Sequence, residues 1–193
     1  MTLEHQFNVQ LKYRGVARHY NYALDREYSN ASPAADQVTL SQIKRMRDED
    51  GIFLQNELSG VFHTGQIKHD TLIGTEYSQQ HKDEIFWLGS KATTDLYDPV
   101  LPHWSPVDTS ATPRVNTASE FENYAVYVQD LISLNEQLRV LAGVRYDHLS
   151  QYRHDQKNNS SIQRNDQTLS PRLGVVYQPT KNLSLYAAYN QSF

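Results

Sequence analysis

The residues best suited to chemistry in this chain are aromatic side chains gathered in one irregular stretch, 84–119. The stretch holds both tryptophans, Trp87 and Trp104, together with Tyr97 and four prolines. A loop of this length without regular structure usually has a functional reason. Rigid, amphipathic rings on an exposed loop are candidate ligand contacts. The alternative is that the rings pack the loop against itself or its neighbours, and the sequence leaves both interpretations open.

A charge run at 44–50, with the sequence KRMRDED, is a second candidate. Its functional interpretation is an electrostatic gate for an anionic ligand. Its structural interpretation is a solvated extension of a strand that carries charges of both signs, and this is the one that the mixed charges favour.

Motifs for catalysis and metal binding are missing from the sequence, so we do not predict an enzyme, a catalytic residue or a resident metal. The eight histidines never cluster at metal-ligand spacing, although His63 and His69 bracket a predicted turn. There is no Gly-rich phosphate loop, nucleophile elbow or HExxH motif. The absence of cysteine excludes a disulfide framework and a thiolate metal site. A formal net charge of -4 gives no reason to expect a nucleic-acid partner.

The elements that must position these residues are clearest in the C-terminal third, where apolar residues alternate with small or polar ones. Three segments show the pattern: Leu138, Val140, Ala142, Val144 and Tyr146; Leu169, Pro171, Leu173, Val175 and Tyr177; and Leu183, Leu185, Ala187 and Tyr189. Because successive side chains of a strand point to opposite faces, each segment has one apolar face. Segments of about ten residues with this pattern are typical of transmembrane β-barrel strands.

A soluble β-sandwich would show the same alternation, but two features favour a membrane barrel. Tyr146, Tyr177 and Tyr189 lie at or near the ends of apolar runs, where a barrel places its interfacial aromatic girdle. The connections also alternate between short and long, as they do in outer-membrane barrels. No run of 18 apolar residues is present, which excludes a transmembrane helix.

The chain is therefore predicted to be all-β, an antiparallel up-and-down meander of about seven strands that forms part of a transmembrane β-barrel. The strands are predicted at about 3–28, 38–63, 67–80, 121–133, 138–152, 168–178 and 183–193. Short periplasmic turns near Gly65, Asn135 and Thr180 would alternate with extracellular loops at about 29–37, 84–119 and 153–167. At Gly15 the apolar parity flips, which predicts a β-bulge inside the first strand.

Several motifs resemble the barrel of TonB-dependent ferric siderophore receptors. They are Tyr-Val-Gln-Asp at Tyr127–Asp130, Gly-x-Arg-Tyr-Asp at Gly143–Asp147, Ser-Pro-Arg-Leu-Gly at Ser170–Gly174 and Tyr-x-x-Tyr-x-x-Ser-Phe at Tyr186–Phe193. The strand Thr71–Ser78 is similar to another barrel strand of the family, more weakly. The resemblance implies a bacterial outer-membrane location, contact with outer-membrane lipid, and energy-coupled import of an iron–siderophore complex.

The resemblance also implies partners and ligand contacts. The ferric siderophore would be the transported ligand rather than a cofactor, and the TonB complex would act through a plug domain inside the barrel. Ligand contacts would come from four loop residues: Trp87, Tyr97, His103 and Trp104.

Three arginines are predicted to face the barrel lumen: Arg139, Arg145 and Arg172. In one interpretation they line the transport path. In the other they pair with lumen carboxylates such as Asp147, and this pairing is the interpretation we favour.

Receptors of the kind that this chain resembles are barrels of about 22 strands closed around an N-terminal plug, so seven strands would supply about a third of one. The sequence contains no plug-like segment, no TonB-contacting segment and no recognisable signal peptide. Seven strands alone would leave the backbone groups of two open edges unpaired in lipid. We therefore expect a fragment of a receptor, with any transport function belonging to the parent protein.

Two other classes of protein stay open as alternatives. The first is a complete small outer-membrane barrel with a structural or adhesion role. Leu185, Tyr189 and Phe193 share one parity, which resembles the terminal signature read by barrel-assembly machinery, although an odd strand number counts against this class. The second is a secreted β-rich enzyme such as a lipid-modifying barrel, for which no Ser/His/Asp-type constellation can be placed.

Overall fold

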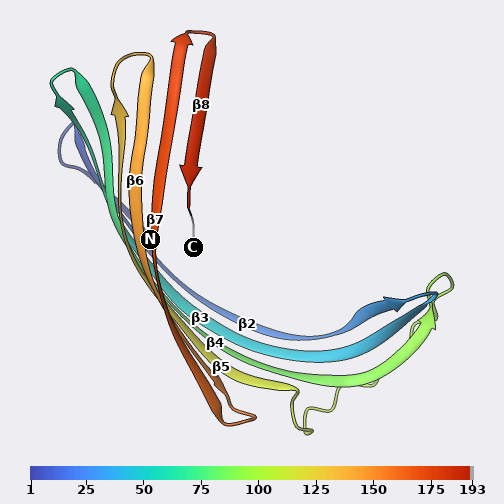
Figure 1. The fold of residues 1–193 in the computed structure, drawn as a ribbon. Coiled ribbons are helices and arrows are strands. Elements are labelled where there is room, and N and C mark those ends of the chain that lie inside the picture. Colours follow the sequence, from blue (N-terminus) through green and yellow to red (C-terminus); the bar gives the residue numbers. More distant parts are fainter. Residues whose placement is uncertain (192–193) are drawn as a thin grey trace.

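The computed structural model describes residues 1–191, which form eight strands in one antiparallel sheet (Figure 1). The strands are β1 (Thr2–Gln6), β2 (Leu11–Ala34), β3 (Gln37–Thr64), β4 (Ile67–Asp95), β5 (Val115–Ser133), β6 (Leu138–Asp155), β7 (Ser160–Thr180) and β8 (Leu183–Asn190). The sheet order follows the chain from β1 to β8 without a crossover. This order confirms the predicted all-β up-and-down meander. Within residues 1–191, no helix is long and apolar enough to cross a membrane.

The two faces of the sheet differ in chemistry. Because partner residues on adjacent antiparallel strands share a face, the register assigns each side chain to one side. The face that we call the outer face gathers the predicted apolar sets; Val128, Val144 and Pro171, for example, form one row across β5, β6 and β7. Leu173 and Leu185 on this face are 53% and 54% exposed. The apolar rows are therefore not buried between two sheets, and their exposure fits strands whose outer face meets lipid.

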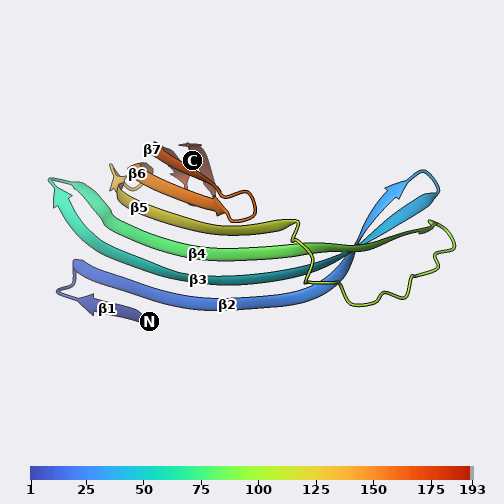
Figure 2. The ribbon, with the colours of Figure 1, turned by 90° about the horizontal axis from the view of Figure 1, so that it is seen from below.

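The connections gather at two ends of the sheet (Figure 2). One end has the short turns 7–10, 65–66, 134–137 and 181–182. The side-chain oxygens of Asn8 and Asn135 each accept two backbone N–H bonds at 2.8 and 2.9 Å, which fixes their turns. Gly65 has a φ of 63°, a conformation that glycine adopts without strain. The other end has the turns 35–36 and 156–159 and the longer segment 96–114, which leaves β4 and returns to β5.

The N-terminal region differs from the prediction. The expected strand 3–28 is two strands, β1 and β2, so the count for the described residues is eight instead of seven. The expected bulge at Gly15 is wrong, because both registers of β2 continue through Gly15 without a shift. The parity flips for another reason. Val16, Tyr20 and Tyr22 lie on the inner face, and at the level of the two tyrosines β2 has passed beyond the apolar band.

The predicted loops 29–37, 84–119 and 153–167 are wrong in extent, because much of each is strand. The irregular residues shrink to 35–36, 96–114 and 156–159. The charge run 44–50 lies within β3, as its structural interpretation predicted. We call residues 18–34, 37–53 and 78–95 of β2, β3 and β4 the extension, since they continue beyond the apolar band. The predicted last strand and its terminal signature reach Phe193, which lies outside the described residues.

Candidate ligand-facing site

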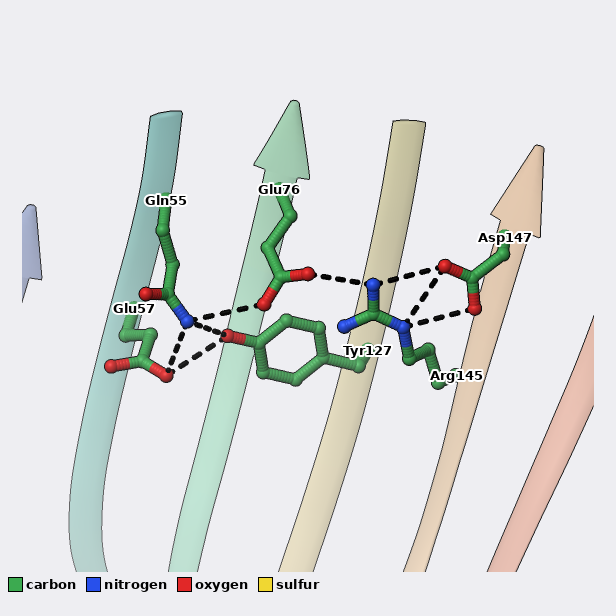
Figure 3. Close-up of polar contacts among 6 residues, drawn as sticks. All are labelled: Gln55, Glu57, Glu76, Tyr127, Arg145 and Asp147. Atoms are coloured by element: carbon green, nitrogen blue, oxygen red, sulfur yellow. Dashed lines mark hydrogen bonds and ion pairs between the residues drawn. The ribbon is translucent and has the colours of Figure 1, made fainter. Parts of the chain in front are cut away.

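A polar cluster of six residues lies on the inner face at the level of the apolar band (Figure 3). Its members are Gln55 and Glu57 from β3, Glu76 from β4, Tyr127 from β5, and Arg145 and Asp147 from β6. The register aligns Glu57, Tyr127 and Arg145 in one row and places Gln55, Glu76 and Asp147 in the next. Side chains of one parity on four neighbouring strands therefore meet on one face, and we call this group the inner cluster.

Arg145 carries the positive charge of the inner cluster. Its Nη2 donates to Glu76 Oε2 at 2.6 Å, and its Nε donates to Asp147 Oδ2 at 2.9 Å. The guanidinium carbon also lies 5.4 Å from the centre of the Tyr127 ring. The side chains of Glu76 and Asp147 are 18% and 15% exposed. These charge-assisted hydrogen bonds are thus partly shielded from water, which strengthens them.

Tyr127 and Gln55 connect this charge to β3. The Tyr127 hydroxyl donates to Glu57 Oε1 at 2.9 Å and accepts from Gln55 Nε2 at 3.1 Å. The ring passes over Gly74 of β4, where an added Cβ would lie 2.2 Å from Tyr127 Cζ. Position 74 must therefore be glycine for the ring to reach across β4.

A hollow of about 800 Å³ adjoins the inner cluster and is lined by Tyr127, Arg145 and Asp147 together with Ser170 and Arg172 of β7. The cluster offers three carboxylates, a guanidinium, a phenol and an amide, which already hydrogen-bond to one another. Such groups supply charge and hydrogen bonds to whatever occupies the hollow, so their chemistry is binding. Among residues 1–191, no group of three or more His, Cys, Asp or Glu side chains is placed to hold a metal ion.

The three predicted lumen arginines lie on the inner face but have different surroundings. Arg145 pairs with Asp147, which is the pairing that the sequence favoured. Arg172 Nη1 donates to Gln129 Oε1 at 3.3 Å. Arg139 has the same parity on β6 and is exposed. That these arginines line a transport path stays a prediction.

Trp87 and Trp104 attach segment 96–114 to the extension. Trp87 lies in β4 instead of a loop, is 9% exposed, and its Nε1 donates to the Ala111 carbonyl at 2.9 Å. Trp104 Nε1 donates to Ser29 Oγ at 2.9 Å. The packing interpretation therefore holds for both indole rings. Ligand contact by either ring stays a prediction.

Tyr97 and His103 lie on the surface of the same part of the chain. Tyr97 is 79% exposed, and His103 is exposed as well. In residues 1–191, no hydrogen bond joins any two of the four predicted ligand residues. Their accessibility suits ligand contact, which stays a prediction.

Gln42 fastens segment 96–114, and the sequence did not indicate it. Gln42 is only 2% exposed. Its Nε2 donates to the Ser105 carbonyl at 2.8 Å and to the Glu27 carboxylate. Glu27 Oε1 also accepts the Val107 N–H at 3.2 Å. A glutamine in a polar run carries no local signal of burial. The segment that covers it starts more than fifty residues later.

Two aspartates in the connections have lowered pKa values. Hydrogen bonds from the side chain and backbone of Asn158 lower the pKa of Asp155. Hydrogen bonds from the hydroxyl and backbone of Ser110 lower the pKa of Asp108. In both cases the ionised carboxylate is the form that accepts these bonds and holds the connection in shape.

Comparison with known proteins gives a consistent result. Residues 1–193 match the family model described as TonB dependent receptor-like, beta-barrel. The chain is 36% identical over 210 residues to the metal-pseudopaline receptor CntO of Pseudomonas aeruginosa strain UCBPP-PA14, covering 100% of this chain and 28% of CntO. It is 27% identical over 145 residues to the ferrichrome outer membrane transporter/phage receptor of Escherichia coli strain K12, covering 72% of this chain and 19% of that protein.

Among solved structures, the fold is similar to that of the siderophore receptor PiuA from Acinetobacter baumannii, with a TM-score of 0.84 and 21% identity. That similarity covers 98% of this chain and 31% of PiuA. The chain therefore spans less than a third of each of these relatives. The relatives named are receptors and transporters.

Proposed function

This chain belongs to the TonB dependent receptor-like β-barrel family, whose members are bacterial outer-membrane proteins, and on that premise we propose its function. It forms part of the barrel wall of a receptor that imports a ferric siderophore, or another metal held by an organic chelator, across the outer membrane. Import is a property of the whole receptor. The part of this chain is to seal the wall against lipid and to face the ligand path.

The two-faced sheet is the observation that carries this proposal. Its outer face exposes rows of large apolar side chains, including Leu173 at 53% and Leu185 at 54%. A contiguous apolar surface of this kind is unfavourable in water and favourable against acyl chains. Its inner face holds the inner cluster, whose charges need water or polar partners. Lipid on one side and a polar passage on the other satisfy both faces.

The proposed mechanism is binding and gating, without bond-making catalysis. The ferric chelate binds at the extracellular end, where the extension and segment 96–114 lie. The TonB complex, acting through a plug domain in the lumen, then opens the passage. The inner cluster lines that passage at membrane level, where Arg145 and the three carboxylates offer hydrogen bonds to the lumen contents.

Uptake by living cells tests the function. The gene encoding the chain is deleted and restored on a plasmid, and uptake of radioactive iron is measured for a panel of siderophores and for other metals bound to organic chelators. We expect deletion to abolish uptake from at least one chelate and the plasmid to restore it. The same uptake should stop when the gene for TonB is deleted or the proton gradient is collapsed.

A matched control separates transport from barrel assembly. A plasmid carrying Met46→Gln, which alters an exposed outer-face side chain of β3, should restore uptake, and the amount of folded receptor in the outer membrane is measured for each strain. Uptake that is unchanged by deletion for every chelate in the panel would disprove the proposed function.

A further inference from the structure

Charge is sorted between the two faces of the extension. At 18–28, 43–53 and 78–88 the inner face carries five cations and two carboxylates: Arg18, Arg26, Arg45, Arg47 and Lys82, with Glu49 and Glu84. The outer face of the same ranges carries five carboxylates and one lysine: Asp25, Glu27, Asp48, Asp50 and Asp83, with Lys44. The inner face is thus net positive in a protein whose formal net charge is -4. We call its five cations the cationic face.

One contact within the cationic face is unfavourable by itself. Arg26 and Arg45 are direct cross-strand partners on β2 and β3. Like charges directly opposite each other destabilise a sheet. Arg26 lies over the Tyr28 ring, with 4.6 Å from its guanidinium carbon to the ring centre, and Arg45 approaches Glu84 at 3.4 Å. An anion bound on the inner face, across β2 and β3, would relieve the repulsion between the two arginines.

Glu84 does not neutralise the cations around it. Arg45, Arg47 and Lys82 approach its carboxylate at 3.4, 3.5 and 3.5 Å. Glu49, the other carboxylate of this face in the same ranges, lies 4.0 Å from Arg47. The Nε atoms of Arg45 and Arg47 are buried and donate no hydrogen bond, since Arg45 Nε lies 3.4 Å from Glu84 Oε1 without hydrogen-bond geometry. Buried donors in native proteins are almost always satisfied, so two unsatisfied ones side by side need an explanation. Guanidinium groups that are incompletely paired can form charge-assisted hydrogen bonds with an anionic partner.

Aromatic rings lie among these cations. The guanidinium carbon of Arg18 lies 5.7 Å from the centre of the Phe53 ring, and that of Arg45 lies 5.6 Å from the centre of the Phe86 ring. Tyr20 shares this face and is 41% exposed. A planar chelating group can stack on such rings while its negative charge meets the neighbouring guanidinium groups.

We propose that the cationic face selects the ligand of the receptor and that it binds metal chelates with a net negative charge, in which carboxylates or phenolates hold the metal. This inference rests on the proposed function and narrows its ligand class. The acidic outer face repels the same ligands, so their approach is steered to the inner face. Within the run 44–50, β3 places Arg45 and Arg47 inward and Asp48 and Asp50 outward, with Lys44 and Glu49 as exceptions, and the resulting difference in net charge between the faces produces the selectivity.

Binding and uptake by cells that produce the complete receptor test this inference. Radioactive iron is offered as anionic ferric dicitrate, as an anionic ferric tris-catecholate, as neutral ferrichrome and as cationic ferrioxamine B. The test variant is the double substitution Arg45→Gln/Arg47→Gln. The matched control is Lys44→Gln, which removes one positive charge from the same strand on the opposite face. The amount of folded receptor in the outer membrane is measured for each variant.

We expect the wild-type receptor to prefer an anionic chelate and the double variant to bind it at least about tenfold more weakly, with less dependence on salt. In the double variant, binding of ferrichrome, if the wild type binds it, should change by less than about twofold. In Lys44→Gln, binding of the anionic chelate should also change by less than about twofold. Three outcomes would disprove the inference and leave the proposed function standing. In the first, the wild type prefers a neutral or cationic chelate, and in the second, the double variant binds all chelates equally more weakly. In the third, Lys44→Gln weakens binding of the anionic chelate as much as the double variant does. If the wild type imports none of the four chelates, the inference fails, and the wider panel of the deletion experiment decides the function separately.

Discussion

The membrane-level part of the sheet and the extension are made from continuous strands in different surroundings. At membrane level, β5 places the apolar Val128 outward and the polar Tyr127 inward. In the extension, β3 places Asp48 outward and Arg47 inward. Hydropathy thus alternates where lipid meets the outer face, whereas in the extension the two faces differ in net charge, with Lys44 outward and Glu49 inward as exceptions on β3. The surrounding medium decides whether hydropathy or net charge distinguishes the two faces.

The two regions are also held together differently. At membrane level, lipid covers the apolar face and the inner cluster joins four strands around Arg145. In the extension, the strands are joined by ion pairs around Glu84, by the pair of Lys44 with Asp25 and by the buried contacts of Gln42. Partly exposed ion pairs contribute little to stability. We therefore expect the extension to open locally at a lower free energy than the membrane-level sheet.

The largest expected effect comes from placing the same charge on the outer face of each region. Val128→Arg puts a cation at the centre of the apolar band, which should destabilise the receptor by about 2–4 kcal/mol. Met46→Arg lies on the outer face of the extension, where the side chain is 40% exposed, and should change stability by less than about 0.5 kcal/mol. Urea unfolding of the receptor in lipid bilayers measures both. Equal effects would mean that lipid does not contact the outer face at Val128.

The next effect concerns the inner cluster. Arg145→Gln leaves Glu76 and Asp147 partly buried without their cation, and we expect a loss of about 1–3 kcal/mol in the free energy of unfolding. The control Arg172→Gln removes one 3.3 Å bond to Gln129 and should cost less than about 1 kcal/mol. The same unfolding assay compares them. A larger loss of stability for Arg172→Gln than for Arg145→Gln would show that Arg145 is not the main stabilising residue of the inner cluster.

The sequence predicts the membrane-level strands better than it predicts the extension. The strands of the C-terminal third were predictable because lipid imposes a strict hydropathy alternation on residues such as Leu173 and Leu185. Residues 29–34 and 84–95 of the extension were predicted as loop because neither alternates in hydropathy: the first is small and polar with Pro33, and the second contains the unbroken apolar run 85–88. The first strand was merged with the second because Asn8 and its neighbours form a turn that contains the apolar Phe7 and Val9.

The candidate site was predictable only where its contacts are local. Arg145 and Asp147 are two residues apart on one strand face, so their pairing followed from the period of a strand. The bond from Arg145 to Glu76 depends on the register of three strands, which no local pattern specifies. Gln42 was missed for the same reason, because its partner Ser105 lies in a segment whose path the sequence does not determine.

A smaller effect is expected where the extension holds segment 96–114. Gln42→Ala removes bonds to Ser105 and Glu27 from a buried position, so the segment should open about tenfold more often. Limited trypsin digestion at Arg114 measures this opening. The control Trp104→Phe keeps an aromatic ring and loses the single bond to Ser29, so a smaller effect is expected. Its cleavage should rise by no more than about threefold. Cleavage at an unchanged rate in Gln42→Ala would show that other contacts hold the segment.

The smallest expected effect is the pH dependence of the turn between β6 and β7. Hydrogen bonds from Asn158 lower the pKa of the Asp155 carboxyl below its ordinary value in the folded state. A group with a lowered folded pKa stabilises the fold above its unfolded pKa, and this contribution disappears as the pH falls through the folded pKa. Asp155 should thus order the turn at neutral pH and release it in acid, below about pH 4. The carboxyl carbon chemical shift of Asp155, followed by NMR during acid titration, measures the pKa directly. Asn158→Ala should bring that pKa back toward its ordinary value, whereas Lys157→Ala keeps the Asn158 bonds and should leave most of the lowering in place; equal pKa values in the two variants would contradict the assignment to Asn158.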